Sequence, residues 1–310
     1  MKKAIITGST GLLGRAVAKY LFDYGIDVLC LGRRQLSTAD IIKIFGREVL
    51  YLNVPMQSIL SLDTNLKFSK WTPDNQCVFY NFAWSGKEGL TDGSFGNQLI
   101  NAIYAANAVK AAKQIGCIKF VNAGTIEETY VEKYLEKKEI TPYQSTQTDY
   151  SLAKLACRDM CKIVAYLEKI DYIHTRLSVP LDPELSMGSY VASTLRKILI
   201  GEAYDAPINK KLFDVISIND VARAYYLIGA GGRNKSDYFI GTGTPTTLSH
   251  FFDKFEKLIS GVGKNDSDNT HPADACLFSI EKLTSDTGFV PAAFFQDFEN
   301  ICNIAISDKI

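Results

Sequence analysis

Tyr150 and Lys154 are the first pair of residues in this sequence whose types and spacing can do chemistry. They lie four residues apart in a stretch with helical periodicity, so their side chains extend from one helix face, one turn apart. An ammonium group beside a phenol stabilises the tyrosinate and lowers the phenol pKa from its usual value of about 10. The pair can therefore exchange a proton with an oxygen atom of a substrate. A surface pair on an amphipathic helix is the alternative interpretation.

Three glycines near the start of the chain indicate a phosphate-binding turn. Gly8, Gly11 and Gly14 follow the apolar segment 3–7 and open a segment with helical periodicity. Glycines here permit a tight turn and a close backbone approach, and the amides at the helix start then bind a pyrophosphate. A purely structural strand-to-helix turn is the alternative. The predicted cofactor cradle consists of Gly8, Thr10, Gly11, Leu12, Leu13 and Gly14.

The second predicted strand, 27–31, ends without the acidic residue that usually contacts the adenosine ribose in a dinucleotide site. An Asp or Glu there accepts hydrogen bonds from the 2′ hydroxyl, whereas an arginine accommodates a 2′ phosphate. In this chain Gly32 is followed by Arg33 and Arg34. We therefore expect NADP(H) as the cofactor, with NAD(H) as the alternative. Two solvent-exposed arginines at a helix start would give the same sequence.

The elements that must position these residues alternate between short apolar strands and amphipathic helices. The expected strands are 3–7, 27–31, 48–54, 77–82, 118–122 and 172–177, and the expected main helices are 12–24, 97–115 and 150–169. This alternation predicts an α/β fold, a Rossmann-type doubly wound parallel sheet. Residues 1–177 are the predicted dinucleotide-binding domain. Residues 178–310 are predicted to form a smaller, mainly substrate-binding part, with a segment of about 213–230 returning to the Rossmann domain.

Charge and cysteine usage argue against several classes of function. The chain has 34 basic and 34 acidic residues among 310, so no bulk electrostatic attraction to nucleic acid or an anionic membrane is expected. No apolar run approaches the roughly 18 residues of a membrane-spanning helix. Seven scattered cysteines without a CxxC motif, and only three histidines, predict no metal site and reduced thiols in a cytoplasmic protein.

Together, the motifs resemble those of one enzyme family. The glycine triplet, Thr125 after the fifth predicted strand, and the Tyr150–Lys154 pair follow the order typical of the extended short-chain dehydrogenase/reductases. The sequence is similar to their nucleotide-sugar epimerase, dehydratase and reductase branch over nearly its whole length. Further matching segments are Asn53-Val54, Asn81 to Trp84, Asn101, Phe213 to Ala222, Tyr238 to Gly243 and Thr287 to Pro291.

The resemblance implies roles for the site residues. Thr125 would hold a sugar hydroxyl or carbonyl, Tyr150 would exchange a proton there, and Lys154 would lower the tyrosine pKa. The substrate-binding residues would be Thr125, Glu127 and Arg176. Besides the glycine turn and the two arginines, the cofactor would contact Asn53, Val54, Phe82, Ala83, Trp84, Tyr150 and Lys154.

Some positions depart from the pattern of the family. Gly32 stands where the ribose-binding acid is usual, and Phe213 stands where an arginine often binds the substrate diphosphate, a role that Lys210 or Lys211 could take. Val179 replaces an expected Asn. Glu127 occupies the position of the dehydratase residue that removes a proton beside the ketone, but Ile126 replaces the polar residue before it; a loop carboxylate facing solvent is the alternative.

The leading expectation is an NADP(H)-dependent reductase that acts on a nucleotide-linked 4-keto-6-deoxy sugar in polysaccharide biosynthesis. The cofactor would supply a hydride and Tyr150 a proton. A nucleotide-sugar 4-epimerase or 4,6-dehydratase would instead recycle a bound cofactor. A regulator that senses NADP(H) without turnover would have no use for Thr125, Tyr150 and Lys154. A homodimer is expected, since the helices 97–115 and 150–169 are apolar on more than one face and the family often pairs them in a four-helix bundle.

Other chemically notable residues receive structural interpretations. His174 lies in a strand pattern, and Cys157 and Cys161 share a helical face that suits the core or a dimer contact. Trp84 suits core packing as well as cofactor contact. The charged run 127–139 is expected to be a solvated helix.

Overall fold

The chain divides into two compact units, each described by itself. A computed structural model describes residues 1–69, 71–86, 94–137, 145–186, 188–205, 212–260 and 276–292. The first unit comprises Met1–Leu177 and Ala222–Tyr238, and the second comprises Ser178–Val221 and Phe239–Ile310. The candidate phosphate-binding residues Lys210 and Lys211 lie outside the described residues.

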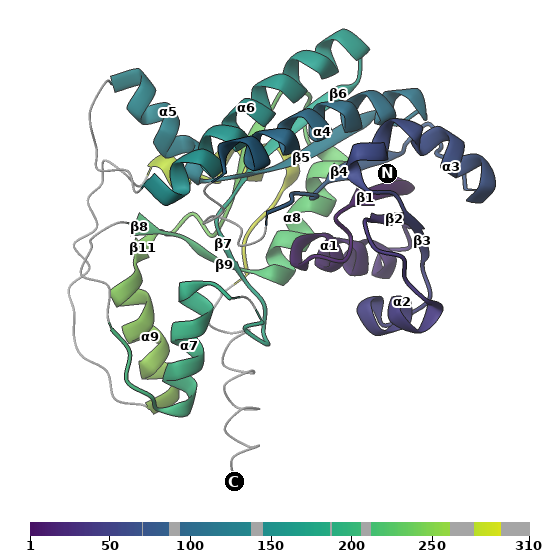
Figure 1. The fold of residues 1–310 in the computed structure, drawn as a ribbon. Helices are drawn as coiled ribbons and strands as arrows, with labels where there is room; N and C mark the ends of the chain where they lie inside the picture. The colour runs from purple at the N-terminus through teal and green to yellow at the C-terminus, as the bar shows by residue number, and fades with distance from the viewer. Residues whose placement is uncertain are drawn as a thin grey trace. The chain divides into compact units, whose positions relative to one another are not determined.

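A seven-stranded sheet forms the centre of the first unit (Figure 1). Its strands are β1 (Lys3–Thr7), β2 (Asp27–Gly32), β3 (Leu50–Asn53), β4 (Val78–Asn81), β5 (Lys119–Thr125), β6 (Asp171–Leu177) and β10 (Asp237–Ile240). The order is β10-β6-β5-β4-β1-β2-β3, and β1 to β6 pair in parallel. The order reverses next to β1, where a Rossmann-type sheet opens its ligand crevice. The predicted fold class is confirmed.

Helices cover both faces of this sheet. They are α1 (Leu12–Asp23), α2 (Thr38–Phe45), α3 (Leu62–Ser69), α4 (Phe95–Gln114), α5 (Glu127–Lys137), α6 (Ser145–Glu168) and α8 (Ile218–Gly231), with a 3-10 helix η1 at Met56–Ser61. In Figure 1, α4 and α6 run together along one face and α1 and α8 lie on the other. The side of α4 that faces the core carries alanines such as Ala105 and Ala112, whose small side chains let it pack closely.

Two element boundaries differ from the expectation for reasons of pairing. β5 continues to Thr125 because its ladder with β6 continues to the Thr125–Leu177 pair. β3 is confined to Leu50–Asn53, the four residues that pair with β2. The longer β5 brings Thr125 to the carboxyl edge of the sheet as part of a strand.

The second unit combines two small ladders with helices. β7 (Val179–Leu181) pairs with β9 (Val215–Ser217), and β8 (Leu212–Phe213) pairs with β11 (Thr246–Thr247). The helices are α7 (Tyr190–Ile200), α9 (Leu248–Ser260), α11 (Glu281–Thr287) and the 3-10 helix η3 (Cys276–Phe278). An apolar cluster that includes Leu195, Phe252 and Phe255 joins α7 to α9. The Asp214 carboxylate accepts hydrogen bonds from the amides of Thr242 and Gly243 at 2.9 and 2.8 Å, which fixes the loop after β10.

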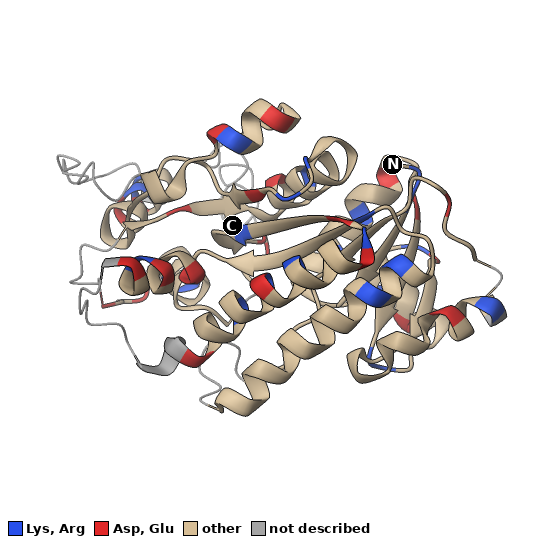
Figure 2. Cartoon of the chain, turned by 90° about the horizontal axis from the view of Figure 1, so that it is seen from above, with Lys and Arg blue, Asp and Glu red and all other residues tan. Residues whose placement is uncertain are grey.

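Basic and acidic positions are interspersed along the described chain, as Figure 2 shows. This pattern accords with the formal net charge of zero. Within the described residues, no helix combines the length and hydropathy that crossing a bilayer requires.

The turn between β1 and α1 requires glycine at two positions. Gly8 has φ +64°, and a Cβ atom on it would lie 2.8 Å from the Ala83 nitrogen. A Cβ atom on Gly14 would lie 2.8 Å from the Gly8 carbonyl carbon and 2.9 Å from Cα of Ser9. These neighbours are backbone atoms, which cannot move aside as a flexible side chain can. The glycines therefore set how closely α1 approaches β1.

We predict that Gly14→Ala lowers the free energy of unfolding by about 1–3 kcal/mol, the usual cost of overpacking. The matched control is Gly96→Ala, also in a helix, because no atom outside its neighbours lies within 4 Å of the added methyl. That variant should be neutral or slightly stabilising. Urea denaturation measures both, and equal stabilities for the two variants would contradict the close approach of α1 and β1.

Candidate active site

A cleft of about 290 Å³ opens at the carboxyl edge of β1, β2 and β4 in the first unit. Eight of the predicted cofactor residues line it: Gly8, Thr10, Gly11, Arg33, Val54, Phe82, Ala83 and Trp84. Leu12, Leu13, Gly14, Arg34, Asn53, Tyr150 and Lys154 are not among its lining residues. Lining residues that the sequence analysis did not single out include Thr7, Gln57, Ser85 and Tyr104. Of these four, only Thr7 could have been expected in the cleft from the sequence, because it is the last residue of the first predicted strand.

The floor of the cleft fits a pyrophosphate. Gly8 and Gly11 present bare backbone there, since neither carries a side chain. Helix α1 begins after Gly11, and no side-chain hydrogen bond caps its first turn. The orphan amides of a helix start, together with the helix dipole, favour a phosphate oxygen. The residues present therefore suit the dinucleotide that the sequence analysis expects.

The carboxyl end of β2 is shaped by Tyr51 of β3. The Tyr51 hydroxyl donates a 2.7 Å hydrogen bond to the Arg34 carbonyl oxygen. A Cβ atom on Gly32 would clash with that hydroxyl and lie 3.1 Å from the ring carbon that bears it. An aspartate at position 32 would therefore have to displace the tyrosine. Arg33 is exposed and lines the cleft, so a basic side chain follows the end of β2 there.

Thr125, Tyr150 and Lys154 lie close together in the first unit. Thr125 ends β5, while the other two residues extend from α6. The Thr125 side chain is hydrogen-bonded to Tyr150. The Lys154 ammonium lies 5.7 Å from the centre of the Tyr150 ring and donates a 3.0 Å hydrogen bond to the Ala123 carbonyl oxygen. Thr125 thus contacts the Tyr150 hydroxyl, and Lys154 lies beside the Tyr150 ring.

The pKa of Tyr150 differs from the sequence-based expectation. Burial raises this pKa above its usual value, and the nearby carboxylates Glu128 and Glu127 raise it further, whereas the hydrogen bond from Thr125 lowers it. Lys154 was expected to lower the pKa of Tyr150, but its ammonium is bound to the Ala123 carbonyl, and burial lowers its own pKa. The expectation was wrong in direction for this arrangement: the phenol is held protonated.

Trp84 connects the cleft with the Tyr150 group. Its ring lines the cleft and meets the Tyr150 ring edge to face, with centroids 5.9 Å apart. The Lys154 ammonium lies 3.9 Å from the centre of the Trp84 ring, a cation–π contact. The indole nitrogen donates a 2.7 Å hydrogen bond to Gln98 of α4. Trp84 thus packs against the core and also lines the cleft, and its contact with the cofactor stays a prediction.

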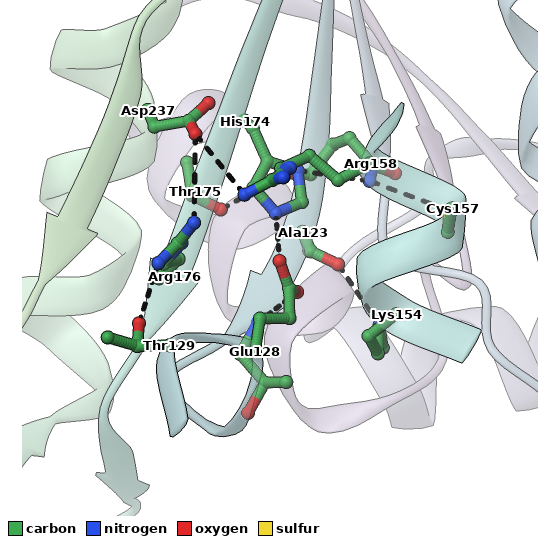
Figure 3. Close-up of polar contacts among 12 residues, drawn as sticks. Ala123, Glu128, Thr129, Lys154, Cys157, Arg158, His174, Thr175, Arg176 and Asp237 are labelled. Carbon is green, nitrogen blue, oxygen red and sulfur yellow. Dashed lines mark hydrogen bonds and ion pairs between the residues drawn. The ribbon is translucent and has the colours of Figure 1, made fainter. Parts of the chain in front are cut away.

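The first turn of α5 is not the solvated helix face that the charged run 127–139 predicted. Glu128 is fully buried, and Glu127 is 9% exposed. Figure 3 shows the Glu128 carboxylate pointing to His174 of β6, with which it makes a 2.8 Å contact. The other Glu128 oxygen accepts a 2.9 Å hydrogen bond from the Thr125 amide. The sequence analysis missed the pair of Glu128 and His174, because nothing in a charged run distinguishes a buried carboxylate from a solvated one.

Arg176 contacts protein groups of α5 rather than the Tyr150 hydroxyl. Its guanidinium donates a 2.7 Å hydrogen bond to the Thr129 hydroxyl (Figure 3). It also pairs with Glu132 at 2.5 Å. Its role with substrate stays a prediction. Among the described residues, no group of three His, Cys, Asp or Glu side chains could hold a metal ion. Cys157 and Cys161 are buried in the core between α4, α6 and the sheet.

Three solved structures share this fold at low identity. The UDP-glucose 4-epimerase of Thermotoga maritima, solved with UDP-glucose, is 17% identical with a TM-score of 0.74, and the match covers 99% of each chain. The UDP-glucose 4-epimerase of Thermus thermophilus, solved with NAD, is 16% identical with a TM-score of 0.69, and 99% of this chain and 100% of that chain are covered. The enzyme WbmF of Bordetella bronchiseptica, in complex with NADH, is 16% identical with a TM-score of 0.69, over 99% of this chain and 94% of that chain.

Structures at such low identity show the fold alone, whereas a family model shows which family the chain belongs to. The model for the NAD dependent epimerase/dehydratase family matches residues 4–241, which include the glycine turn, Thr125, Tyr150 and Lys154. The resemblance noted from the motifs is thereby confirmed. The protein is an enzyme of the extended short-chain dehydrogenase/reductase type, and it belongs to the NAD dependent epimerase/dehydratase family.

Proposed function

We propose that this enzyme is an NADP(H)-dependent reductase of a nucleotide-linked 4-keto-6-deoxy sugar. One observation carries the proposal: the partly buried Tyr150 phenol is hydrogen-bonded to Thr125 and lies beside Lys154, where it can act as a proton donor, and its pKa is raised rather than lowered. A phenol that stays protonated is a proton donor, which a carbonyl reduction requires. An epimerase or a dehydratase must begin with the opposite step and remove a proton from a hydroxyl.

Each residue would have one task in the reduction. The Thr125 hydroxyl would hold the C4 carbonyl oxygen of the sugar, and Tyr150 would donate its proton to that oxygen. Bound NADPH would supply the hydride, so that the carbonyl becomes a hydroxyl and the cofactor becomes NADP⁺. Lys154 would face the ribose beside the nicotinamide. The UDP-glucose in the Thermotoga maritima epimerase supports a nucleotide sugar as substrate.

The preference for NADP(H) rests on the end of β2. Gly32 cannot carry an acid without displacing Tyr51, and Arg33 lines the cleft. An arginine at this point suits the 2′ phosphate that distinguishes NADP(H). The proposal accordingly places the adenosine ribose beside Arg33, and NAD(H), the cofactor in two of the related structures, remains the alternative.

A 4,6-dehydratase is the second candidate, and Glu127 favours it. Its carboxylate is largely buried and lies close enough to Tyr150 to raise the pKa of that phenol. A buried carboxylate beside the reacting carbon could remove the C5 proton. Ile126, which is buried rather than polar, is the departure that argues for the reductase.

We also propose that the protein is a cytoplasmic homodimer that works in polysaccharide biosynthesis. Large apolar side chains are exposed on α4 and α6: Ile103 at 43%, Ile163 at 61%, Tyr166 at 70% and Leu167 at 68%. Two copies of this helix pair could bury them in a four-helix bundle. The cysteines that the structure describes are all free thiols, which suits a reducing compartment.

We predict that the wild-type enzyme binds NADPH more tightly than NADH and that Arg33→Ala removes the difference. Loss of one charge-assisted bond to the 2′ phosphate should weaken NADPH binding roughly 10- to 100-fold and leave NADH binding unchanged. Arg34→Ala is the matched control, because Arg34 does not line the cleft. Titration calorimetry gives the affinities. Equal wild-type affinities for the two cofactors would refute the preference.

We predict that Tyr150→Phe lowers kcat about 100- to 10,000-fold, the usual cost of losing a general acid. Affinity for NADPH should stay within about twofold, since the hydroxyl is not a phosphate contact. In the wild type, kcat should stay level from neutral pH upward and fall only as the pH approaches the raised Tyr150 pKa, because the acid must stay protonated. A loss of less than about fivefold in the variant would remove Tyr150 from the mechanism.

We predict that Glu127→Gln keeps most of the activity on a 4-keto-6-deoxy sugar nucleotide with added NADPH. A reduction needs no base at C5, whereas a dehydration does. The wild type should also form no 4-keto product from an unmodified nucleotide hexose, as judged by mass spectrometry. If it forms that product, and Glu127→Gln abolishes it, the enzyme is a dehydratase.

A further inference from the structure

A row of buried polar side chains crosses the sheet in register, at right angles to the strands. Thr7 of β1 pairs with Asn81 of β4, Asn81 pairs with Asn122 of β5, and Asn122 pairs with His174 of β6. Each of the four side chains is at most 3% exposed. With Glu128 at its end, we call this set the polar row. Buried polar side chains are retained where their hydrogen bonds are satisfied, so the direction of each bond can be followed.

The row begins at the cofactor cleft. The Thr7 hydroxyl accepts a 3.3 Å hydrogen bond from the Ala83 amide, and both residues line the cleft. The same hydroxyl donates to Oδ1 of Asn81 at 2.7 Å, and Nδ2 of Asn81 donates to Oδ1 of Asn122 at 2.9 Å. Every donor so far points the same way along the row, toward β6.

This direction fixes the protonation of His174. Oδ1 of Asn122 already accepts from Asn81, so the group that faces Nδ1 of His174, at 3.3 Å, is the Asn122 NH₂ group. An amide NH₂ only donates, and Nδ1 must therefore be bare. The Tyr172 hydroxyl lies 3.2 Å from Nδ1 and also reaches the Arg158 carbonyl oxygen, to which it donates at 3.3 Å. The imidazole proton then resides on Nε2, which lies 2.8 Å from Glu128.

The row ends on a carboxylate that also holds the residue next to the phenol. Oε2 of Glu128 accepts from His174, and Oε1 accepts from the Thr125 amide at 2.9 Å. Both oxygens of the buried Glu128 carboxylate thus face hydrogen-bond donors, which suits an ionised carboxylate. All donors of the chain thus converge on one ionised group. Hydrogen bonds aligned in this way polarise and strengthen one another in a low-dielectric interior.

Gly124 makes room for the pair. A Cβ atom at this position would clash with both Nε2 of His174 and Oε1 of Glu128. The contact between the histidine and the carboxylate therefore depends on the missing side chain of the residue just before Thr125. His174 and Glu128 can therefore approach the end of β5 this closely only with glycine at position 124.

We infer that Glu128 and His174 are positioning residues of this enzyme: the polar row keeps His174 in its neutral Nε2–H form and Glu128 ionised, and the pair holds the Thr125 backbone against Tyr150. The row itself stands on the contacts above. Its effect on turnover rests on the proposed function, in which Thr125 and Tyr150 act on the substrate. Neither Glu128 nor His174 is assigned a contact with substrate or cofactor.

Glu128→Gln and His174→Gln separate this role from simple packing. In Glu128→Gln, the new amide has only one oxygen, so its NH₂ group must face either the Nε2–H group of His174 or the Thr125 amide. A move of the histidine proton to Nδ1 would face the Asn122 NH₂ group instead. The conflict therefore cannot be relieved within the row. In His174→Gln, the new amide can accept from Asn122 and donate to Glu128, which reproduces the neutral histidine. Glu136→Gln, an exposed charge change on the same helix, is the matched control.

The first experiment is steady-state kinetics with NADPH and a 4-keto-6-deoxy sugar nucleotide. Glu128→Gln should lower kcat about 10- to 100-fold, a cost typical of a misplaced reacting group, with KM and NADPH affinity within about twofold. His174→Gln and Glu136→Gln should keep kcat within about threefold of the wild type. Wild-type kcat in Glu128→Gln, or a loss in His174→Gln as large as in Glu128→Gln, would overturn the inference.

The second experiment needs no substrate. Nitrogen-15 NMR of the wild-type imidazoles identifies His174 as the signal missing from His174→Gln, and it should show a protonated Nε2 and a bare Nδ1. A proton on Nδ1, alone or together with Nε2, would overturn the inference even if Glu128→Gln failed to fold. If no sugar nucleotide is turned over while the Nε2–H form is found, the proposed function fails and the polar row stands.

Discussion

The parallel register of β1, β4 and β5 is the constraint on which the rest of the site depends. It aligns Thr7, Asn81 and Asn122 in one row and ends all three strands at the same edge of the sheet. The glycine turn after β1, the Trp84 segment after β4 and Thr125 at the end of β5 are therefore neighbours, although they are far apart in sequence. A slip of one residue in any of these ladders would turn the polar row to the opposite face and separate the groups.

The pKa values of the site residues depend more on burial than on the nearest charged group. Lys154 and Glu128 are buried and Tyr150 is partly buried, and burial is the largest influence on the pKa of all three. For Tyr150 and Lys154 the result favours the neutral form. For Glu128 the convergent donors from His174 and Thr125 outweigh burial and keep the charge. The site thus combines one proton donor with one fixed negative charge that does not compete for the proton.

The fold could be predicted from the sequence because the apolar periodicity of each strand and helix is a local property. Helical spacing also predicted that Tyr150 and Lys154 share one helix face, whereas the place of Thr125 beside them was implied by the family resemblance. Sequence patterns did not predict the burial of Glu128 or the packing of Tyr51 over Gly32, because both depend on which strands become neighbours. The direction of the Tyr150 pKa shift failed for a related reason: the spacing places a lysine one turn away but does not show that its ammonium binds the Ala123 carbonyl.

The central claim is that hydride passes from an exchangeable NADPH to the sugar while Tyr150 supplies the proton. Two NADPH preparations, deuterated on one or the other face of the nicotinamide at C4, test it most directly when supplied with a 4-keto-6-deoxy sugar nucleotide. The account predicts that one of the two transfers a single deuterium to C4 of the product sugar, with one NADPH consumed for each sugar reduced. A product sugar that contains no deuterium from either preparation would contradict the account.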